Sequence, residues 1–262
     1  MKTEILIVSC AKHFDWLKYS IRSIVKFATG FNQIKIMIPG DDMTAINPVL
    51  AELSSHQGTP IRVGFFEDWP EKGFLRHEHI IMTSDEHCPE ADFICHVDSD
   101  CLFTEPVTPE DYFEDGKPIL YFESFASITR QYPEVGVWQG VTQNCLPFTV
   151  LFETMRRHPG VFHRGLYGKA REEMERKTNM SVETYVRQQS NQFPQTFCEF
   201  NTLGNVAMQH FGDRYSLKNM EGISAWPPQK LVQFWSHSPP NIPQRPMFKG
   251  VPTEATPDYF LK

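Results

Sequence analysis

Several features that would assign the chain to a class at once are missing from its sequence. No segment approaches the roughly 18 consecutive apolar residues of a membrane-spanning helix. The six cysteines are scattered and form no CxxC pair, so reduced, buried thiols are expected. The formal net charge of −7 gives no overall attraction to nucleic acid or to an anionic membrane surface.

The start of the chain carries no recognisable secretory signal. Residues 1–9 contain one lysine and an apolar run, but Glu4 interrupts the run and no cleavage-site pattern follows. We therefore predict a cytoplasmic protein without a transmembrane segment. With 262 residues, of which 40% are hydrophobic and 22% charged, the composition is typical of a globular chain, and the 20 prolines predict many irregular connections.

Strand and helix patterns alternate through the N-terminal part of the sequence. Apolar segments typical of buried strands occupy residues 5–8, 33–38, 61–66 and 93–97, and helical patterns lie between them at residues 15–27, 48–55 and 74–85. Such alternation predicts an α/β fold with a mostly parallel central sheet flanked by helices.

The regular alternation of strands and helices ends in the second part of the chain. We predict strands at residues 119–123, 135–141 and 230–235, and helices at residues 148–158, 167–177, 181–189 and from 197 onward. A Pro-rich tail follows the last strand, and no internal repeat is present. The sequence thus favours one large domain.

Two aspartates follow the fourth predicted strand directly. In an extended chain Asp98 and Asp100 project to the same side, so both can offer oxygens to one point. Mg²⁺ and Mn²⁺ prefer such ligands and commonly bridge phosphate oxygens. The alternative is an Asp-rich turn that only ends the strand.

Three separated motifs, taken with the N-terminal alternation, resemble GT-A glycosyltransferases. They are Val97-Asp98-Ser99-Asp100, Cys198-Glu199-Phe200-Asn201 and Phe234-Trp235-Ser236-His237. The resemblance covers most of the chain and implies a Rossmann-like single domain. It implies a nucleotide-binding half at residues 1–101, an acceptor and catalytic half at residues 102–238, and a tail at residues 239–262.

The resemblance also implies a divalent metal, Mn²⁺ or Mg²⁺, that holds the diphosphate of a nucleotide-sugar donor such as a UDP-sugar. Asp100 would be the main ligand and a catalytic residue, with Asp98 and His237 completing the set. Because hard cations seldom choose imidazole, His237 favours Mn²⁺. A histidine after a strand can also act only in capping or packing.

Glu199 is the candidate for a further functional carboxylate. In enzymes of this type the equivalent acid is either a general base, which gives inversion, or a contact to the donor sugar, which gives retention, and the sequence does not choose between them. At a predicted helix start, the helix dipole would keep Glu199 ionised, although ordinary N-terminal capping is the simpler role.

Strand ends supply candidate contacts to the nucleotide, because ligands of open α/β sheets bind beyond the carboxyl ends of the strands. Six residues are candidates besides the Asp98-Ser99-Asp100 motif. They are Ser9, Cys10 and Lys12 for the base and phosphates, Asp41 (or Asp42) for the ribose, and Arg76 and His77 for the diphosphate or sugar. Ser99 lies between the two metal-binding aspartates. For Arg76 and His77 a solvated helix face is the alternative.

Other residues have weaker roles in this hypothesis. Trp138 and Gln139 would offer a flat face and an amide to a sugar, or pack in the core. A basic patch would contact an anionic acceptor or be solvated surface, and it consists of Arg156, Arg157, His158, His163, Arg164 and Lys169. Arg245 and Lys249 would close over the diphosphate.

We therefore expect a metal-dependent glycosyltransferase that moves a sugar to an acceptor hydroxyl. The acceptor stays open among a glycan, a lipid-linked glycan, a protein and a hydroxylated nucleobase. A nucleotidyltransferase is an alternative, but it would normally need a Gly-rich basic loop after the first strand, and residues 9–15 contain no glycine. A phosphatase would place its acidic pair after the first strand. The remaining alternative is a non-catalytic nucleotide-sugar-binding module.

Overall fold

A five-stranded sheet forms the centre of the protein. The computed structural model describes residues 1–51, 58–69, 72–155, 159–191, 196–223, 230–234 and 261. The strand order is β3-β2-β1-β4-β9. The bounds are β1 (Thr3–Val8), β2 (Gln33–Pro39), β3 (Ile61–Phe66), β4 (Phe93–His96) and β9 (Gly160–His163). The first four strands are parallel and β9 runs antiparallel to β4. The sheet is therefore mixed, with an antiparallel edge.

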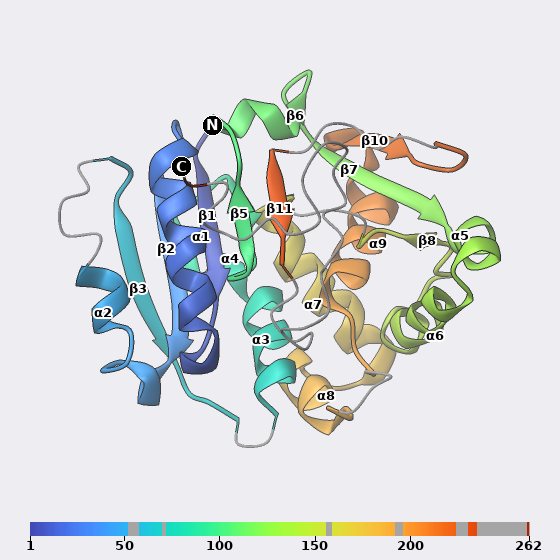
Figure 1. Cartoon of the computed structure of the whole chain (residues 1–262). Helices are drawn as coiled ribbons and strands as arrows, with labels where there is room; N and C mark the ends of the chain where they lie inside the picture. Colours follow the sequence, from blue (N-terminus) through green and yellow to red (C-terminus); the bar gives the residue numbers. More distant parts are fainter. Residues whose placement is uncertain are drawn as a thin grey trace.

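Both faces of the sheet are covered by helices, because alternate residues of its central strands are apolar on either side. Ile5 and Ile7 pack toward α1, whereas Leu6 and Val8 pack toward α3, α7 and α9. Figure 1 shows α1 across one face of β1 and β2. The helices are α1 (Phe14–Phe27), α2 (Asn47–Ala51), α3 (Gly73–Met82), α4 (Ser84–His87), α5 (Phe125–Gln131), α6 (Gly136–Cys145), α7 (Gly165–Thr178), α8 (Val182–Gln188) and α9 (Glu199–Phe211).

Smaller strands complete the fold beside the central sheet. A second sheet has the order β10-β7-β6, and β8 pairs with β7. A third pair joins β11 to β5 in antiparallel fashion, although the two lie far apart in the sequence, and Figure 1 shows them side by side. The bounds are β5 (Cys101–Phe103), β6 (Phe113–Glu114), β7 (Lys117–Ser124), β8 (Phe152–Glu153), β10 (Ser216–Asn219) and β11 (Leu231–Gln233). Five short 3₁₀ turns connect these elements within the described part of the chain: η1 (Ala11–His13), η2 (Gly40–Asp42), η3 (Pro109–Tyr112), η4 (Pro133–Val135) and η5 (Gly212–Arg214).

The sequence-based prediction of an α/β fold is confirmed, and most N-terminal elements lie where the patterns place them. The strand predicted at residues 61–66 coincides with β3, and the helix predicted at residues 15–27 is α1. The predicted helices at 167–177, 181–189 and from 197 are α7, α8 and α9. For the helix predicted at 48–55 and the strand predicted at 230–235, the parts at residues 52–55 and 235 lie outside the described residues.

Two predictions for the second part of the chain are wrong. Residues 135–141 are not a strand, since Gly136 to Cys145 form α6, which buries Val141, Thr142 and Cys145 at helical spacing. The predicted helix at 148–158 is also absent over its described residues 148–155, where β8 pairs with β7 instead. In both segments, packing against the rest of the fold overrides the local preference for a strand or a helix.

All six cysteines are free thiols, and all but the half-buried Cys10 are buried. Among the described helices, none is long and apolar enough to cross a membrane. Of the predicted basic patch, Arg156, Arg157 and His158 lie outside the described residues. His163 is not a surface charge, because it is buried beside Phe211 and burial lowers its pKa to about 4.

Gly204 on α9 offers a test of this packing. A Cβ atom at this position would overlap the side chain of Thr154, whose hydroxyl is fixed by hydrogen bonds to Phe200 and Asn201. We expect Gly204→Ala to lower the free energy of unfolding by about 1–3 kcal/mol, measured by chemical denaturation.

The matched control is Gly140→Ala on α6, where a Cβ atom meets open space. Alanine is the better helix former, so this variant should gain about 0.5–1 kcal/mol. Equal effects of the two substitutions would contradict the packing of α9 described above.

Candidate metal centre

The two aspartates predicted to bind a metal lie in a tight turn between β4 and β5. The parallel ladder with β1 continues one residue past β4, where the Val97 N–H donates to the Leu6 carbonyl at 3.1 Å. The turn is closed by the Cys101 N–H, which donates to the Asp98 carbonyl at 3.0 Å. Asp98 is half-buried, whereas Ser99 and Asp100 are buried. The turn thus presents carboxylates where β4 ends.

A C-terminal strand closes this turn from the other side. The β11 residue Gln233 lies opposite Cys101 in the ladder, and its side-chain amide donates to both carboxylates. The distances from Gln233 Nε2 are 3.2 Å to Asp98 Oδ2 and 3.4 Å to Asp100 Oδ1. The next residue, Phe234, donates its N–H to the Asp100 carbonyl at 2.9 Å and stacks on Trp16 of α1. Sequence-distant segments therefore meet at the aspartates.

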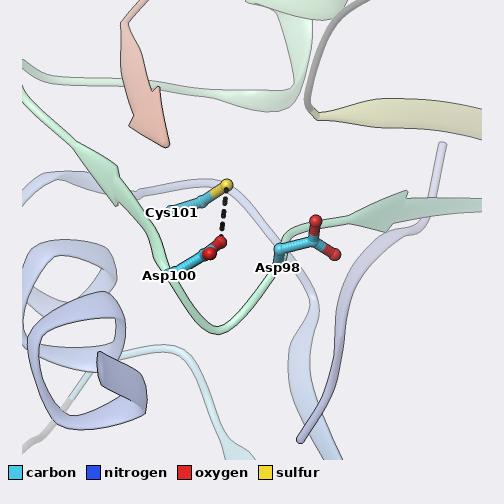
Figure 2. A group of neighbouring side chains, drawn as sticks. All are labelled: Asp98, Asp100 and Cys101. Atoms are coloured by element: carbon cyan, nitrogen blue, oxygen red, sulfur yellow. Dashed lines mark hydrogen bonds between the residues drawn. The ribbon is translucent and has the colours of Figure 1, made fainter. Parts of the chain in front are cut away.

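The donor set suits a hard cation. Asp98, Asp100 and Cys101 place one ligand atom each within 4.8 Å of one another. Figure 2 shows the Cys101 sulfur facing the Asp100 carboxylate, with the Asp98 carboxylate turned away from them. Burial, followed by the charges of the two aspartates, raises the pKa of the Cys101 thiol well above its ordinary value. A hard cation such as Mg²⁺ or Mn²⁺ prefers carboxylate oxygens to a thiol, so the two carboxylates are the donors that suit it.

Ser9 follows β1, the parallel neighbour of β4, so it lies at the same edge of the sheet as the aspartates. Its backbone N–H donates to the Met37 carbonyl at 2.9 Å. Its hydroxyl oxygen is buried and has no hydrogen-bond partner among the described residues. A buried hydroxyl without a partner is costly, and this one lies at the edge of the sheet where the nucleotide site is predicted.

The ends of β1 and β2 are tied together by Asp42. Its Oδ2 accepts a hydrogen bond from the Ala11 N–H at 2.7 Å, next to the predicted contacts Cys10 and Lys12. Cys10 is half-buried, and burial raises the pKa of its thiol. Lys12 and Asp41 are both exposed. The predicted contacts Ser9, Cys10, Lys12 and Asp41 thus share one edge of the sheet, while Asp42 has a structural role there.

Arg76 and His77 lie on the first turns of α3 but have different surroundings. Arg76 packs over the Trp69 ring at 4.8 Å and donates to the Glu67 carbonyl at 2.7 Å. These contacts anchor the guanidinium to the end of β3. His77 is half-buried, and its proximity lowers the pKa of Glu199. The structure therefore places His77 with the predicted catalytic carboxylate.

Glu199 begins α9, as predicted, and is buried there. Its side chain is hydrogen-bonded to that of Glu78 on α3, which is also buried. Burial raises the pKa of Glu199, while His77, the hydrogen bond to Glu78 and its own backbone N–H act in the opposite direction. Asp98 is close enough for its charge to raise the pKa further. Glu199 therefore shares an electrostatic environment with the aspartate turn.

Several predicted site residues are not brought to this centre. Trp138 and Gln139 lie on α6, where the Gln139 amide donates to the Val150 carbonyl at 2.8 Å. The predicted metal ligand His237 and the predicted lid residues Arg245 and Lys249 lie outside the described residues.

Two residues of the centre were not found from the sequence. Glu78 had a detectable signal, because it stands on the apolar stripe of α3 between Leu75 and Met82, where an aliphatic side chain is expected. Gln233 had none, since its role depends on the pairing of β11 with β5.

Comparisons with known proteins add no assignment. No protein-family model matches the sequence, and no curated protein matches it significantly. The interpretation of the site therefore depends on its own geometry.

Removal of the Gln233 amide tests whether the Asp98 and Asp100 carboxylates form a cation site. We expect Gln233→Ala to destabilise the metal-free protein by about 1–3 kcal/mol, because the buried Asp100 carboxylate loses a donor. Added Mn²⁺ should restore most of the loss, since a cation would satisfy the same oxygens. Thermal unfolding with chelator and with Mn²⁺ measures both effects.

Gln143→Ala is the matched control. The Gln143 side chain braces the following loop by bonding to the Leu146 and Phe148 carbonyls and the Val150 N–H. Its loss should destabilise the protein equally with and without Mn²⁺. A Gln233→Ala defect that Mn²⁺ leaves unchanged would argue against a cation at the aspartates.

Proposed function

We propose that this protein is a metal-dependent glycosyltransferase of the GT-A type, which moves a sugar from a nucleoside-diphosphate sugar to an acceptor hydroxyl. The observation that carries the proposal is the pair Asp98 and Asp100 at the carboxyl end of β4, with oxygens directed to one amide donor. A cation at that point would have two oxygen ligands.

The position of the pair in the sheet supports a nucleotide ligand. The order β3-β2-β1-β4 reverses direction at β1, so the switch point of the sheet lies between β1 and β4. Open α/β sheets bind ligands beyond the carboxyl ends of the strands at such a point. Ser9 and the Asp98–Asp100 turn are the chain segments on either side of it.

The proposed residues have separate tasks. Asp98 and Asp100 hold the cation, which when bound supplies positive charge for the departing nucleoside diphosphate. His237 is proposed as a third ligand. It follows Phe234 by three residues, a length of chain that spans at most about 11 Å, and Phe234 is bonded to Asp100. The Ser9 hydroxyl, Cys10, Lys12 and Asp41 line the nucleotide site.

The acceptor side of the proposal rests on Glu199. It is the buried carboxylate that the fold places within electrostatic range of the aspartate turn, at the start of α9. We propose that Glu199 acts on the acceptor hydroxyl. The candidate acceptors are a glycan, a lipid-linked glycan, a protein and a hydroxylated nucleobase. The donor is proposed to be a UDP-sugar bound with Mn²⁺ or Mg²⁺.

Nucleotide-dependent thermal unfolding tests the donor site. UDP should raise the melting temperature only when Mn²⁺ is present, by an amount that corresponds to about 2.7 kcal/mol at a hundredfold excess over Kd. Asp100→Asn should lose this stabilisation. The control Asp92→Asn changes an exposed carboxylate at the opposite end of β4 and should keep it. Stabilisation by UDP that is indifferent to metal would contradict the proposal.

Turnover separates an enzyme from a binding module. A panel of nucleotide sugars, followed by mass spectrometry, should reveal transfer or slow donor hydrolysis by the wild type. Loss of residues that only orient metal ligands costs about 10–100-fold, so Asp100→Asn should lose more than that in kcat/KM. Wild-type turnover by Asp100→Asn would remove the central claim, and UDP binding without turnover would indicate a binding module.

A further inference from the structure

A small cavity lies between β9, the edge strand of the central sheet, and β7 of the second sheet. Its lining includes Leu120 of β7, Met155, residues 160–162 of β9 and Phe200 of α9. The volume of the cavity is about 40 Å³. One water molecule needs about 10–15 Å³, so there is room for a group of about three or four non-hydrogen atoms. Met155 is 40% exposed, and the cavity is therefore open to solvent at this side chain.

One wall of the cavity is apolar. Leu120, Phe162 and Phe200 are buried members of the same core cluster. The rings of Phe162 and Phe200 are stacked, with their centroids 6.4 Å apart and their planes inclined by 19°. Gly160 leaves space in front of these rings, because a Cβ atom there would lie 3.1 Å from the Phe162 ring and 3.6 Å from the Phe200 ring. This wall therefore suits a methyl group.

The other wall is polar, because it is formed by the main chain of Val161. The Val161 side chain packs in the core cluster on the α1 face of the sheet, so its main chain is what lines the cavity. The Arg164 N–H donates to the Asp92 carbonyl beside β4, whereas the His163 N–H donates to the Tyr215 hydroxyl. Because backbone groups alternate along a strand, Val161 points its N–H and C=O the same way as His163, away from β4.

That side of β9 is the edge of the central sheet, so no described strand pairs with it. A main-chain N–H and C=O that face a cavity need hydrogen-bond partners. The Val161 peptide groups therefore offer a substrate one donor and one acceptor, next to the apolar wall.

The cavity lies close to the aspartate turn and to Glu199. Gly160 is opposite His96 in the ladder of β9 with β4. Asp98 follows His96 by two residues, so the Cα atoms of Gly160 and Asp98 are at most about 13 Å apart. Phe200 directly follows Glu199 at the start of α9. A sugar held between the aspartate turn and Glu199 would therefore lie beside the cavity.

We propose that this cavity binds the acetamido group of an N-acetylated sugar substrate. The inference rests on the proposed function and adds the class of sugar to it. The acetyl methyl group packs on the rings of Phe162 and Phe200, and the acetyl carbonyl accepts a hydrogen bond from the Val161 N–H. A neighbouring hydroxyl of the sugar donates to the Val161 carbonyl. A plain hydroxyl in place of the acetamido group would leave the apolar wall without a contact.

Pairs of ligands that differ only at this group test the proposal. Isothermal titration with Mn²⁺ compares UDP-N-acetylglucosamine with UDP-glucose. A second arm, with UDP and Mn²⁺ present, compares the methyl glycosides of N-acetylglucosamine and glucose. The acetylated ligand should bind at least about tenfold more tightly, in the first arm if the donor carries the group and in the second if the acceptor does. Equal affinities within both pairs would overturn the inference.

Gly160→Ala places a Cβ atom against the Phe162 ring and narrows the cavity. We expect this variant to lose most of the preference for the acetylated ligand. The ratio of the two affinities is the readout, because damage to the fold or to the metal site lowers both members of a pair alike. The matched control is Gly140→Ala on α6, where a Cβ atom meets open space, and it should keep the wild-type ratio. An unchanged ratio in Gly160→Ala would contradict the assignment of the group to this cavity.

Saturation-transfer NMR on the wild type needs neither a variant nor turnover. In the methyl glycoside of N-acetylglucosamine, the acetyl methyl protons should receive the largest saturation, because they lie against two aromatic rings. Saturation spread evenly over the sugar would overturn the inference. UDP binding with Mn²⁺ but without any acetamido preference would leave the proposed function standing and remove this inference. The NMR signature in a protein that binds no UDP would remove the proposed function and keep the cavity as an acetamido site.

Discussion

The parallel ladder between β1 and β4 is the constraint on which the rest of the structure depends. Both strands are buried on both faces, and their pairing fixes the register from Thr3 opposite Phe93 to Leu6 opposite His96. The ladder ends with the bond from Val97 to Leu6, so the chain must turn at Asp98. If β4 were shorter or shifted in register, the Asp98 and Asp100 carboxylates would not lie at the edge of the sheet where Ser9 lies.

Burial of this turn then requires a partner from elsewhere in the chain. A carboxylate that leaves water without hydrogen bonds is strongly disfavoured. The Gln233 amide donates to both carboxylates, and the Phe234 N–H donates to the backbone carbonyl of Asp100. Both residues are held by the pairing of β11 with β5 and by the stacking of Phe234 on Trp16. A contact between residues 133 positions apart thus completes a site that a three-residue motif begins.

The sequence predicts well those elements whose burial is two-sided. Residues 5–8 and 93–97 are apolar runs, and they lie as the mostly buried strands β1 and β4 in the middle of the sheet. The segment 135–141 misleads because its β-branched valines and Trp138 favour a strand locally, while packing places residues 136–141 in α6. The loop before β8 is likewise held by the Gln143 side chain, a contact without any local pattern.

The same distinction applies to the site. Asp98 and Asp100 are neighbours in the chain, so their spacing and the preceding strand predict that they act together. Glu78 and Glu199 are brought together by the packing of α3 against α9, and only the glutamate on the apolar stripe of α3 hints at it. Spacing reveals pairs within one element, whereas pairs between elements require the fold.

Two pairs of carboxyl groups therefore lie near each other, and the protein compensates their burial differently. The Asp98 and Asp100 carboxylates both receive the Gln233 side-chain amide at a turn that is only partly closed, which leaves negative charge directed to one point. Glu78 and Glu199 are closed off from solvent, and burial raises the pKa of both carboxyl groups, which favours their neutral form. A cation suits the first pair and a proton suits the second. The proposed transfer of a sugar from a diphosphate to a hydroxyl would make these two demands, since negative charge develops on the leaving group while a proton must leave the acceptor.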